Sequence, residues 1–143
     1  MTLADRLSEN HRRSLSITLQ LLDETLCGWD DCVRGHFRSG VIYFERDSFS
    51  NKQKRELSAR IVRTREIITR LRDELLLQPK VVEMSRPVMT QASSMWETLL
   101  DVTSRGLTAY GHVPPEISNY IDRLVLGLAD EMLQVAKLIS EEA

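Results

Sequence analysis

The 143-residue sequence has few of the residue types that build metal, redox or phosphate sites, with two cysteines, three histidines and six glycines. On one continuous helix Cys27 and Cys32 would point about 140° apart, so we expect no unstrained disulfide between them. Two cysteines without Cys-x-x-Cys spacing are typical of a reducing compartment. The glycines are scattered along the chain, so no loop is built to bind phosphate.

An excess of charge and a long apolar run are missing too. The 19 Lys and Arg residues and 21 Asp and Glu residues give a formal net charge of −2, which disfavours a surface that binds nucleic acid throughout. No apolar run approaches the roughly 18 residues of a membrane span. The first residues include Asp5 and lack the apolar segment of a signal peptide. We therefore expect a cytoplasmic protein without membrane contact, folded as one domain over residues 1–143.

Most of the sequence has the periodicity of amphipathic helices, in four stretches, and little of it resembles a β-strand. The first stretch covers about 3–33, with Thr2 as its N-cap and Gly35 as its stop signal. His11 falls within the apolar row of this stretch. The other members of the row are Leu3, Leu7, Leu15, Leu19, Leu22, Leu26, Trp29 and Val33.

The second stretch covers 51–78 and has the clearest helical pattern. Ser50 followed by Gln53 matches a capping box, and Pro79 is expected to end the helix. The apolar positions follow steps of 4, 3, 4, 3 and 4, which is a heptad seam with one polar member. The seam consists of Leu57, Ile61, Thr64, Ile68, Leu71 and Leu75.

The third stretch is expected to start after Ser85 as its N-cap, with Pro87 in its first turn, and the fourth starts at Pro114-Pro115. Two apolar rows on the third stretch predict a helix that is covered on more than one side. These rows are Val88, Ala92, Met95, Leu99, Val102 and Gly106, and Met89, Trp96, Leu100 and Leu107. The fourth stretch is lined by Ile117, Ile121, Leu124, Leu128, Met132, Val135 and Ile139 and is expected to reach the C-terminus.

These stretches predict an all-α fold, an up-down-up-down four-helix bundle with a long aromatic-rich link between the first and second helices. The connections at Pro79 and around 111–114 are short, so the helices that they join are expected to be antiparallel neighbours. The link over 35–50 is long for a compact bundle, and five of the eight aromatic residues fall within 29–49. We expect the link to pack over one end or along one side of the bundle.

The spacing of potential ligands excludes several chemistries. The sequence has no Glu-x-x-His pair for a di-iron site, no His-x-x-x-His pair for a helical zinc site and no Asp-Asp-x-x-Asp motif for magnesium. The motifs GxSxG and GxGxxG are absent as well. We therefore expect no catalytic residues, no metal and no cofactor, and the sequence favours a non-enzymatic protein.

The link and the residues before it hold the most concrete candidates for a binding site. The aromatic side chains of this region could close one end of the bundle. Alternatively, they form the wall of an apolar pocket or a dimer contact, to which His36 and Tyr43 supply polar groups. His11 is either an ordinary residue at the edge of the core or a ligand or proton relay. The predicted ligand-binding set is Trp29, His36, Tyr43, Phe44 and His11.

Charge is unevenly distributed between the helices. Residues 52–74 contain eight basic and four acidic residues, a net charge of +4, and residues 116–143 contain two basic and six acidic residues, a net charge of −4. We expect these helices to pair, within one bundle or between subunits. An anion or nucleic acid on Arg63, Arg65, Arg70 and Arg72 is the weaker alternative, because no aromatic residue lies between these arginines.

Two functions from different classes fit this pattern. The first is a non-enzymatic helical bundle that acts through protein–protein contacts, as a homo-oligomer or with another protein. The double apolar face of the third helix, the apolar link and the missing catalytic motifs favour it. The alternative is a bundle that binds a small apolar ligand or a metal, with or without catalysis. Its site would lie under the 36–49 link, with His11, Asp30 or Asp31 as polar anchors.

Overall fold

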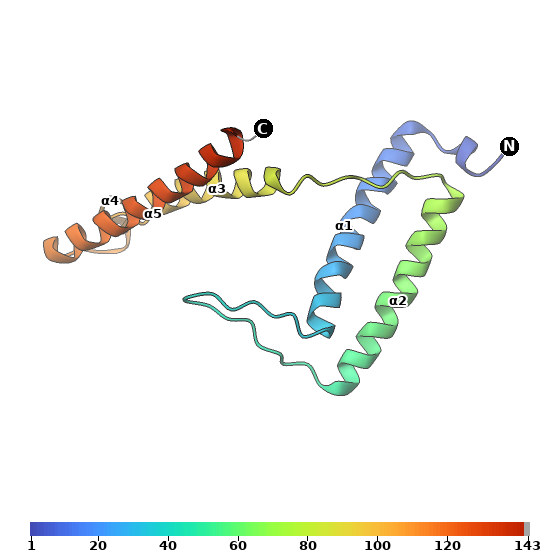
Figure 1. The fold of residues 1–143 in the computed structure, drawn as a ribbon, viewed down its shortest axis with the longest axis horizontal. Coiled ribbons are helices and arrows are strands. Elements are labelled where there is room, and N and C mark those ends of the chain that lie inside the picture. Colours follow the sequence, from blue (N-terminus) through green and yellow to red (C-terminus); the bar gives the residue numbers. More distant parts are fainter. Residues whose placement is uncertain (142–143) are drawn as a thin grey trace. The chain divides into compact units, whose positions relative to one another are not determined.

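The computed structural model describes residues 1–141 and is all-α, which confirms the predicted fold class (Figure 1). Its α-helices are α1 (Glu9–Val33), α2 (Asn51–Glu74), α3 (Ser85–Leu100), α4 (Ser104–Leu107) and α5 (Pro115–Glu141). The described residues also form two short 3₁₀ helices, η1 (Ala4–Arg6) near the N-terminus and η2 (Thr108–Tyr110) after α4. Over residues 1–141, no helix is long and apolar enough to cross a bilayer.

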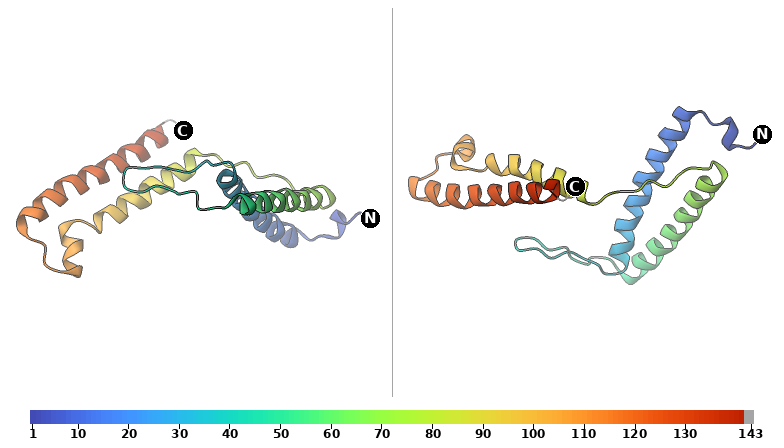
Figure 2. Two further views of the ribbon diagram at one scale, coloured as in Figure 1. Left: turned by 90° about the horizontal axis from the view of Figure 1, so that it is seen from below. Right: turned by 45° about the horizontal axis from the view of Figure 1, so that its top comes forward.

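The chain divides into two compact units, Met1–Lys80 and Val81–Ala143. In the first unit α1 and α2 lie side by side and antiparallel, and a long link joins them (Figure 1). In the second unit α3 and α5 form another antiparallel hairpin, with α4 and η2 in the connection between them (Figure 2). Within its own unit, each long helix therefore has one long neighbour.

The start and the apolar seam of α2 form as predicted. The hydroxyl of Ser50 accepts a hydrogen bond from the backbone N–H of Gln53 at 3.1 Å, and the side chain of Gln53 accepts one from the N–H of Ser50 at 2.9 Å. Ile61 is buried, and the other seam residues are half-buried. Thr64, the polar member, donates its hydroxyl to the carbonyl of Arg60 at 2.7 Å, so its polar group is satisfied within its own helix.

The predicted start of the first helix is wrong. Ser8 is the N-cap of α1, because its hydroxyl accepts a hydrogen bond from the N–H of His11 at 3.1 Å, and Leu7 before it is extended. Thr2 instead lies just before Leu3, the N-cap of the separate turn η1, and its hydroxyl accepts a hydrogen bond from the N–H of Asp5 at 3.3 Å. Each segment has its own capping residue, and apolar periodicity alone does not separate them.

Arg12 occupies the inner face of α1, where the sequence pattern placed His11. His11 is exposed, whereas the guanidinium of Arg12 donates hydrogen bonds to the carbonyl oxygens of Leu75 and Leu76 just after α2. The same guanidinium donates to the carbonyl of Ala4 in η1 at 3.0 Å. One arginine therefore joins η1, the start of α1 and the end of α2.

The end of α2 and the connection after it differ from the prediction. The helix ends at Glu74, before Pro79. Leu76 has a φ of 52°, in the left-handed region that costs residues with a side chain about 1–2 kcal/mol. Leu77 follows as a buried side chain, and its N–H donates to the carbonyl of Arg72 at 2.9 Å. A non-helical segment then runs to α3, so the connection is longer than predicted.

The third helix is shorter than predicted at its C-terminal end. It begins with Ser85 inside the helix, after Met84 in an N-cap position that has no side-chain hydrogen bond, and it ends at Leu100. Gly106, predicted on the apolar row of this helix, lies in the separate helix α4. A Cβ on Gly106 would be 1.9 Å from the carbonyl oxygen of Asp101. Glycine is therefore required where α4 folds back against the end of α3.

One carboxylate connects the start of α4 to α5. Asp122 accepts hydrogen bonds from the hydroxyl and from the backbone N–H of Ser104, both at 2.6 Å. Both hydrogen bonds lower the pKa of Asp122 below the ordinary value of 3.8, and the bond from the hydroxyl has the larger effect. The carboxylate therefore holds the connection between α3 and α5 in place most strongly when it is ionised.

We expect Asp122→Asn to destabilise the second unit at neutral pH, because an amide offers one acceptor oxygen to two donors. Folding lowers the pKa of Asp122. The carboxylate therefore makes its full contribution to the free energy of unfolding above pH 3.8, and this contribution is lost as the pH falls through the lowered pKa. The melting temperatures of the wild type and the variant should therefore differ at neutral pH and converge in acid. A difference that persists unchanged into acid would contradict the assignment.

Several residues predicted for a bundle core are exposed. In the α3·α5 hairpin, Ala92 and Ala129 are buried, but Met95 and Leu124 are 48% and 46% exposed. The cause is the pairing itself, since a helix with one neighbour covers one stripe of its surface and these helices have a second apolar row. The all-α fold is confirmed, whereas the packing of four long helices into one bundle stays a prediction.

Candidate functional site

The C-terminal end of α1 is fixed by a Schellman motif. Gly35 has a φ of 76°, its N–H donates to the carbonyl of Cys32 at 3.1 Å, and the N–H of His36 donates to the carbonyl of Asp31 at 2.8 Å. A side chain at position 35 would be strained in this conformation. The predicted stop at Gly35 is confirmed, and the motif fixes the direction in which the link leaves the helix.

Residues 38–45 of the link form a short β-hairpin, here called the finger. Ser39 and Phe44 make an antiparallel bridge. At the base, the N–H of Glu45 donates to the carbonyl of Arg38 at 2.8 Å, and the N–H of Arg38 donates to the carboxylate of Glu45 at 2.7 Å. The finger is therefore held by reciprocal bonds at its base.

The tip of the finger is apolar and exposed. Val41 and Ile42 form the turn, which is closed by a hydrogen bond of 2.9 Å from the N–H of Gly40 to the carbonyl of Tyr43. Val41 and Ile42 are 101% and 96% exposed, and Phe44 is exposed as well. The expectation that the link packs over the helices is therefore not met at the tip of the finger.

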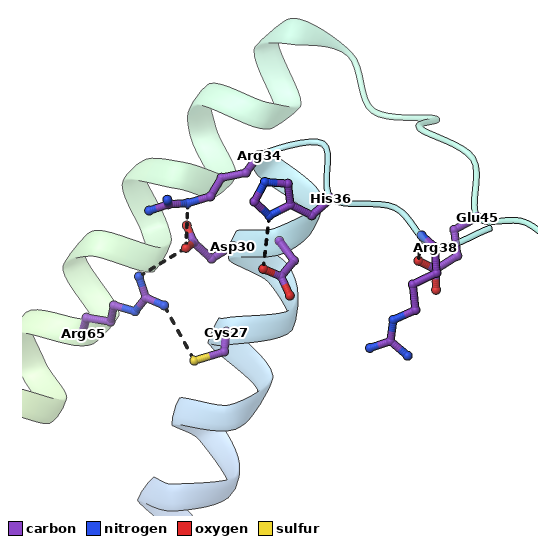
Figure 3. A network of polar contacts seen from close by, with 8 residues as sticks. Cys27, Asp30, Arg34, His36, Arg38, Glu45 and Arg65 are labelled. Atoms are coloured by element: carbon purple, nitrogen blue, oxygen red, sulfur yellow. Dashed lines mark hydrogen bonds and ion pairs between the residues drawn. The ribbon is translucent and has the colours of Figure 1, made fainter. Parts of the chain in front are cut away.

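A set of polar side chains connects the C-terminal part of α1 to α2 (Figure 3). Asp30 lies 3.0 Å from the guanidinium of Arg34 and 3.8 Å from that of Arg65, which belongs to α2. The guanidinium of Arg65 also lies 4.0 Å from the sulfur of Cys27. Exposed pairs of this kind contribute up to about 1 kcal/mol each, so the set links the C-terminal part of α1 to the middle of α2 with little gain in stability.

The structure places most of the predicted ligand-binding residues near one end of the first unit. Trp29 lies in the last turns of α1, and His36, Tyr43 and Phe44 follow in the link, all four with exposed side chains. His11 lies near the other end of α1, about 27 Å from Trp29 along the helix at 1.5 Å per residue. The structure therefore does not bring His11 together with the other four.

The polar groups at this end of the unit do not gather around a common point. Nδ1 of His36 lies 3.6 Å from the carboxylate of Asp31. Cys27 and Cys32 are free thiols, the first exposed and the second half-buried. Over the described residues, no group of three or more His, Cys, Asp and Glu side chains is placed to hold a metal ion. This end of the unit therefore has exposed polar groups and the exposed apolar tip of the finger.

The sequence did not identify the tip of the finger as an exposed surface, because hydrophobicity alone predicts burial for Val41 and Ile42.

The sequence also left open an anionic partner on the arginines of α2. In the structure three of those arginines have acidic neighbours within 3.8 Å, which weakens that alternative. The pairs are Arg65 with Asp30, Arg70 with Glu74 and Arg72 with Asp73.

The α3·α5 hairpin has a second candidate surface, here called the open face. At 100° per residue, the exposed apolar row of each helix lies about a quarter turn from the line joining the two helices. Because the helices are antiparallel, both rows lie on the same side of the hairpin. The open face consists of Val88 and Met95 of α3, Val102 just after α3, and Ile117, Tyr120, Leu124, Leu128 and Leu138 of α5, all with exposed side chains.

Both candidate surfaces are apolar and exposed, one on a finger and one on a pair of helices. No family model matches the chain, and no curated protein and no solved structure shows significant similarity to it.

Proposed function

We propose that the protein is non-enzymatic, acts through protein–protein contacts and associates with itself. The observation that supports this most strongly is the open face, an exposed apolar surface that extends over two helices. Large exposed apolar patches mark interaction sites on folded domains. Burying the exposed half of one Leu or Ile side chain contributes roughly 1 kcal/mol, so the whole face favours association strongly.

The finger supports the same proposal. Val41 and Ile42 have no cover from the chain itself and lie at the end of a hairpin with bonds at its base. An apolar projection held by hydrogen bonds at its base fits a recess on a partner surface at a lower cost in conformational entropy than a free segment would. We propose that the finger is a second contact element, used with the open face or with a different protein.

Two arrangements could cover the open face. One is the bundle predicted from the sequence, with all four long helices of one chain in a single domain over 1–143. The other is the same hairpin from a second copy, which also gives four helices around one core. We propose the second arrangement, in the reducing cytoplasm, where the free Cys27 and Cys32 fit the environment.

Sedimentation equilibrium of the full chain from low to high micromolar concentration tests the proposal. Self-association predicts an average mass that rises from that of one chain to that of two or more. A mass that stays at one chain over the whole range would remove self-association and favour the single-chain bundle.

A second candidate function, binding of a small apolar ligand, is supported by the exposed aromatic side chains of Trp29 at the end of α1 and of Tyr43 and Phe44 in the link that also holds His36. A thermal-shift screen with elemental analysis of the purified protein tests it. A ligand that raises the melting temperature by several degrees, or a metal at one equivalent per chain, would favour this function over the first. No shift and no metal would remove it.

A further inference from the structure

The finger carries its apolar tip away from the helices of its own unit. It projects from the ends of α1 and α2 that it joins (Figure 1). Val41 and Ile42 in the turn are almost fully exposed, and Tyr43 and Phe44 behind them are 53% and 66% exposed. Four consecutive apolar or aromatic side chains are therefore exposed at the tip of one projection.

One face of the finger carries Tyr43 and Arg38. The bridge between Ser39 and Phe44 fixes the register of the two strands. Because neighbouring residues of a strand point to opposite faces, Arg38 and Tyr43 share the face opposite to Phe44. The ring of Tyr43 lies across Gly40, since a Cβ on Gly40 would be 2.9 Å from two of the ring carbons. On this face an aromatic ring near the tip is followed by an arginine farther back.

The other face repeats this order with Phe44 and Arg46. The guanidinium of Arg46 lies over the ring of Phe44, 5.7 Å from its centroid, a distance at which a cation and an aromatic ring attract each other. Arg46 is two residues farther from the tip than Phe44. Both faces therefore have an aromatic ring close to the tip and an arginine behind it.

The two arginines have no acidic partner within the part of the chain that the structure describes. None of the ion pairs there involves Arg38 or Arg46. The carboxylate of Glu45 accepts a hydrogen bond from the backbone N–H of Arg38. Figure 3 shows the guanidinium of Arg38 pointing away from the polar contacts of α1 and α2. The positive charges of the finger are therefore available to an anionic partner.

Along its axis the finger is layered by polarity. At about 3.4 Å per residue, Arg38 lies about 7 Å and Arg46 about 10 Å behind the level of Tyr43. A protein segment that enters one side of a bilayer has the same layers over a similar depth. Its apolar groups reach about 5–10 Å into the boundary between headgroups and acyl chains. Aromatic rings lie at this interface, and basic groups meet the anionic headgroups.

The same layering on both faces favours a lipid surface over a recess in a protein. A bilayer surrounds an inserted hairpin with the same layers on every side, so both faces need the same order of side chains. The walls of a protein recess differ from one another and do not require this symmetry. The expectation of a protein without membrane contact rests on the lack of a spanning apolar run, which an interfacial segment does not need.

We propose that the finger inserts Val41 and Ile42 into the surface of an anionic lipid bilayer, with Arg38 and Arg46 at the headgroups. This inference goes beyond the proposed function. The open face keeps its role in self-association, and the finger takes a lipid surface in place of a recess on a protein.

Cosedimentation of the full chain with lipid vesicles tests the proposal. We expect binding to vesicles of equimolar phosphatidylcholine and phosphatidylserine. Binding to vesicles of phosphatidylcholine alone should be weaker by about tenfold or more, because each arginine near an anionic surface contributes about fivefold in affinity. No binding to either kind of vesicle would overturn the proposal, leave the finger to a protein recess and leave the proposed function standing.

A pair of double variants tests whether the tip makes the contact. V41S/I42S removes the apolar tip, and V62S/I67S removes the same residue types from α2, where they are 54% and 56% exposed. We expect V41S/I42S to lose about tenfold or more in affinity for the anionic vesicles and V62S/I67S to bind like the wild type. A tip variant that binds as well as the wild type, or an equal loss in both variants, would overturn the proposal.

A second pair tests the two arginines at constant net charge. R38Q/R46Q removes the basic groups of the finger, and R13Q/R63Q removes two exposed arginines of α1 and α2 that have no ion pair in the described part of the chain. We expect R38Q/R46Q to lose about tenfold or more on anionic vesicles and R13Q/R63Q to lose less than about twofold. Equal losses would mean that net charge drives binding and would overturn the proposed placement of the finger.

Tryptophan fluorescence reports which part of the chain enters the lipid. In a W29F/W96F background, Ile42→Trp places the only tryptophan at the tip, and Leu21→Trp places it at an exposed position of α1. We expect anionic vesicles to shift the emission of I42W to shorter wavelength and to leave that of L21W unchanged. A shift at position 21 without one at position 42 would overturn the proposal. Sedimentation without lipid measures self-association separately, so either proposal can fail without the other.

Discussion

Replacing Leu26 by alanine should lower the free energy of unfolding of the first unit by about 2–3 kcal/mol. Leu26 is 1% exposed, and Ile61 of α2 is the other large side chain buried to this extent among the described residues. A truncation there leaves a cavity between two helices that have few other fully buried contacts. Urea unfolding followed by Trp29 fluorescence, in a Trp96→Phe background, measures the loss for this unit.

Leu21→Ala is the matched control on the same helix. Leu21 is 59% exposed, and its truncation should cost well under about 1 kcal/mol. Equal losses for the two variants would mean that α1 and α2 do not pack through Leu26. A much larger loss for Leu21 would mean that another chain or segment covers the outer side of α1.

Replacing Gly106 by alanine is expected to destabilise the second unit by about 1–3 kcal/mol. The new Cβ would lie 1.9 Å from the carbonyl oxygen of Asp101 and 2.6 Å from its carbonyl carbon. Both atoms belong to the backbone, so no side-chain rotation relieves the clash and α4 has to move. Unfolding followed by Trp96 fluorescence, in a Trp29→Phe background, reports on this unit.

Gly28→Ala gives the opposite expectation and serves as the control for the glycine change itself. Gly28 lies inside α1, and a Cβ there would have nothing within 4 Å. Alanine should therefore stabilise α1 by about 0.5–1 kcal/mol through its better helix propensity. If G106A were as stabilising as G28A, the close approach of α4 to Asp101 would be contradicted.

The elements that the sequence predicted best are those specified by nearby residues. The cap at Ser50, the seam from Leu57 to Leu75 and the stop at Gly35 each follow from a short motif. The all-α fold and the start of α5 at the proline pair follow for the same reason. Local hydrogen bonds and local periodicity decide these features, so one sequence is enough to predict them.

The features that the sequence did not predict depend on residues far apart in the chain. Arg12 takes the inner position of α1 because carbonyls after α2 accept its hydrogen bonds. The third helix breaks after Leu100, where Ser104 is bonded to Asp122 of α5. Periodicity also cannot tell whether an apolar row such as that of Leu124 is covered by the same chain or by another. His11 of the predicted ligand-binding set lies near the start of α1, at the other end of the helix from Trp29, which a pattern of local spacing does not decide against.

The turn of the finger has a further consequence for how this protein could change. Two-residue hairpin turns usually use Asn-Gly or Asp-Gly, whose backbone preferences fit the turn, but this turn consists of Val41 and Ile42. The hairpin must therefore derive its stability from the reciprocal bonds of Arg38 and Glu45 at its base. Substitutions at the tip are accordingly free to change the surface chemistry of the finger while α1 and α2 stay folded.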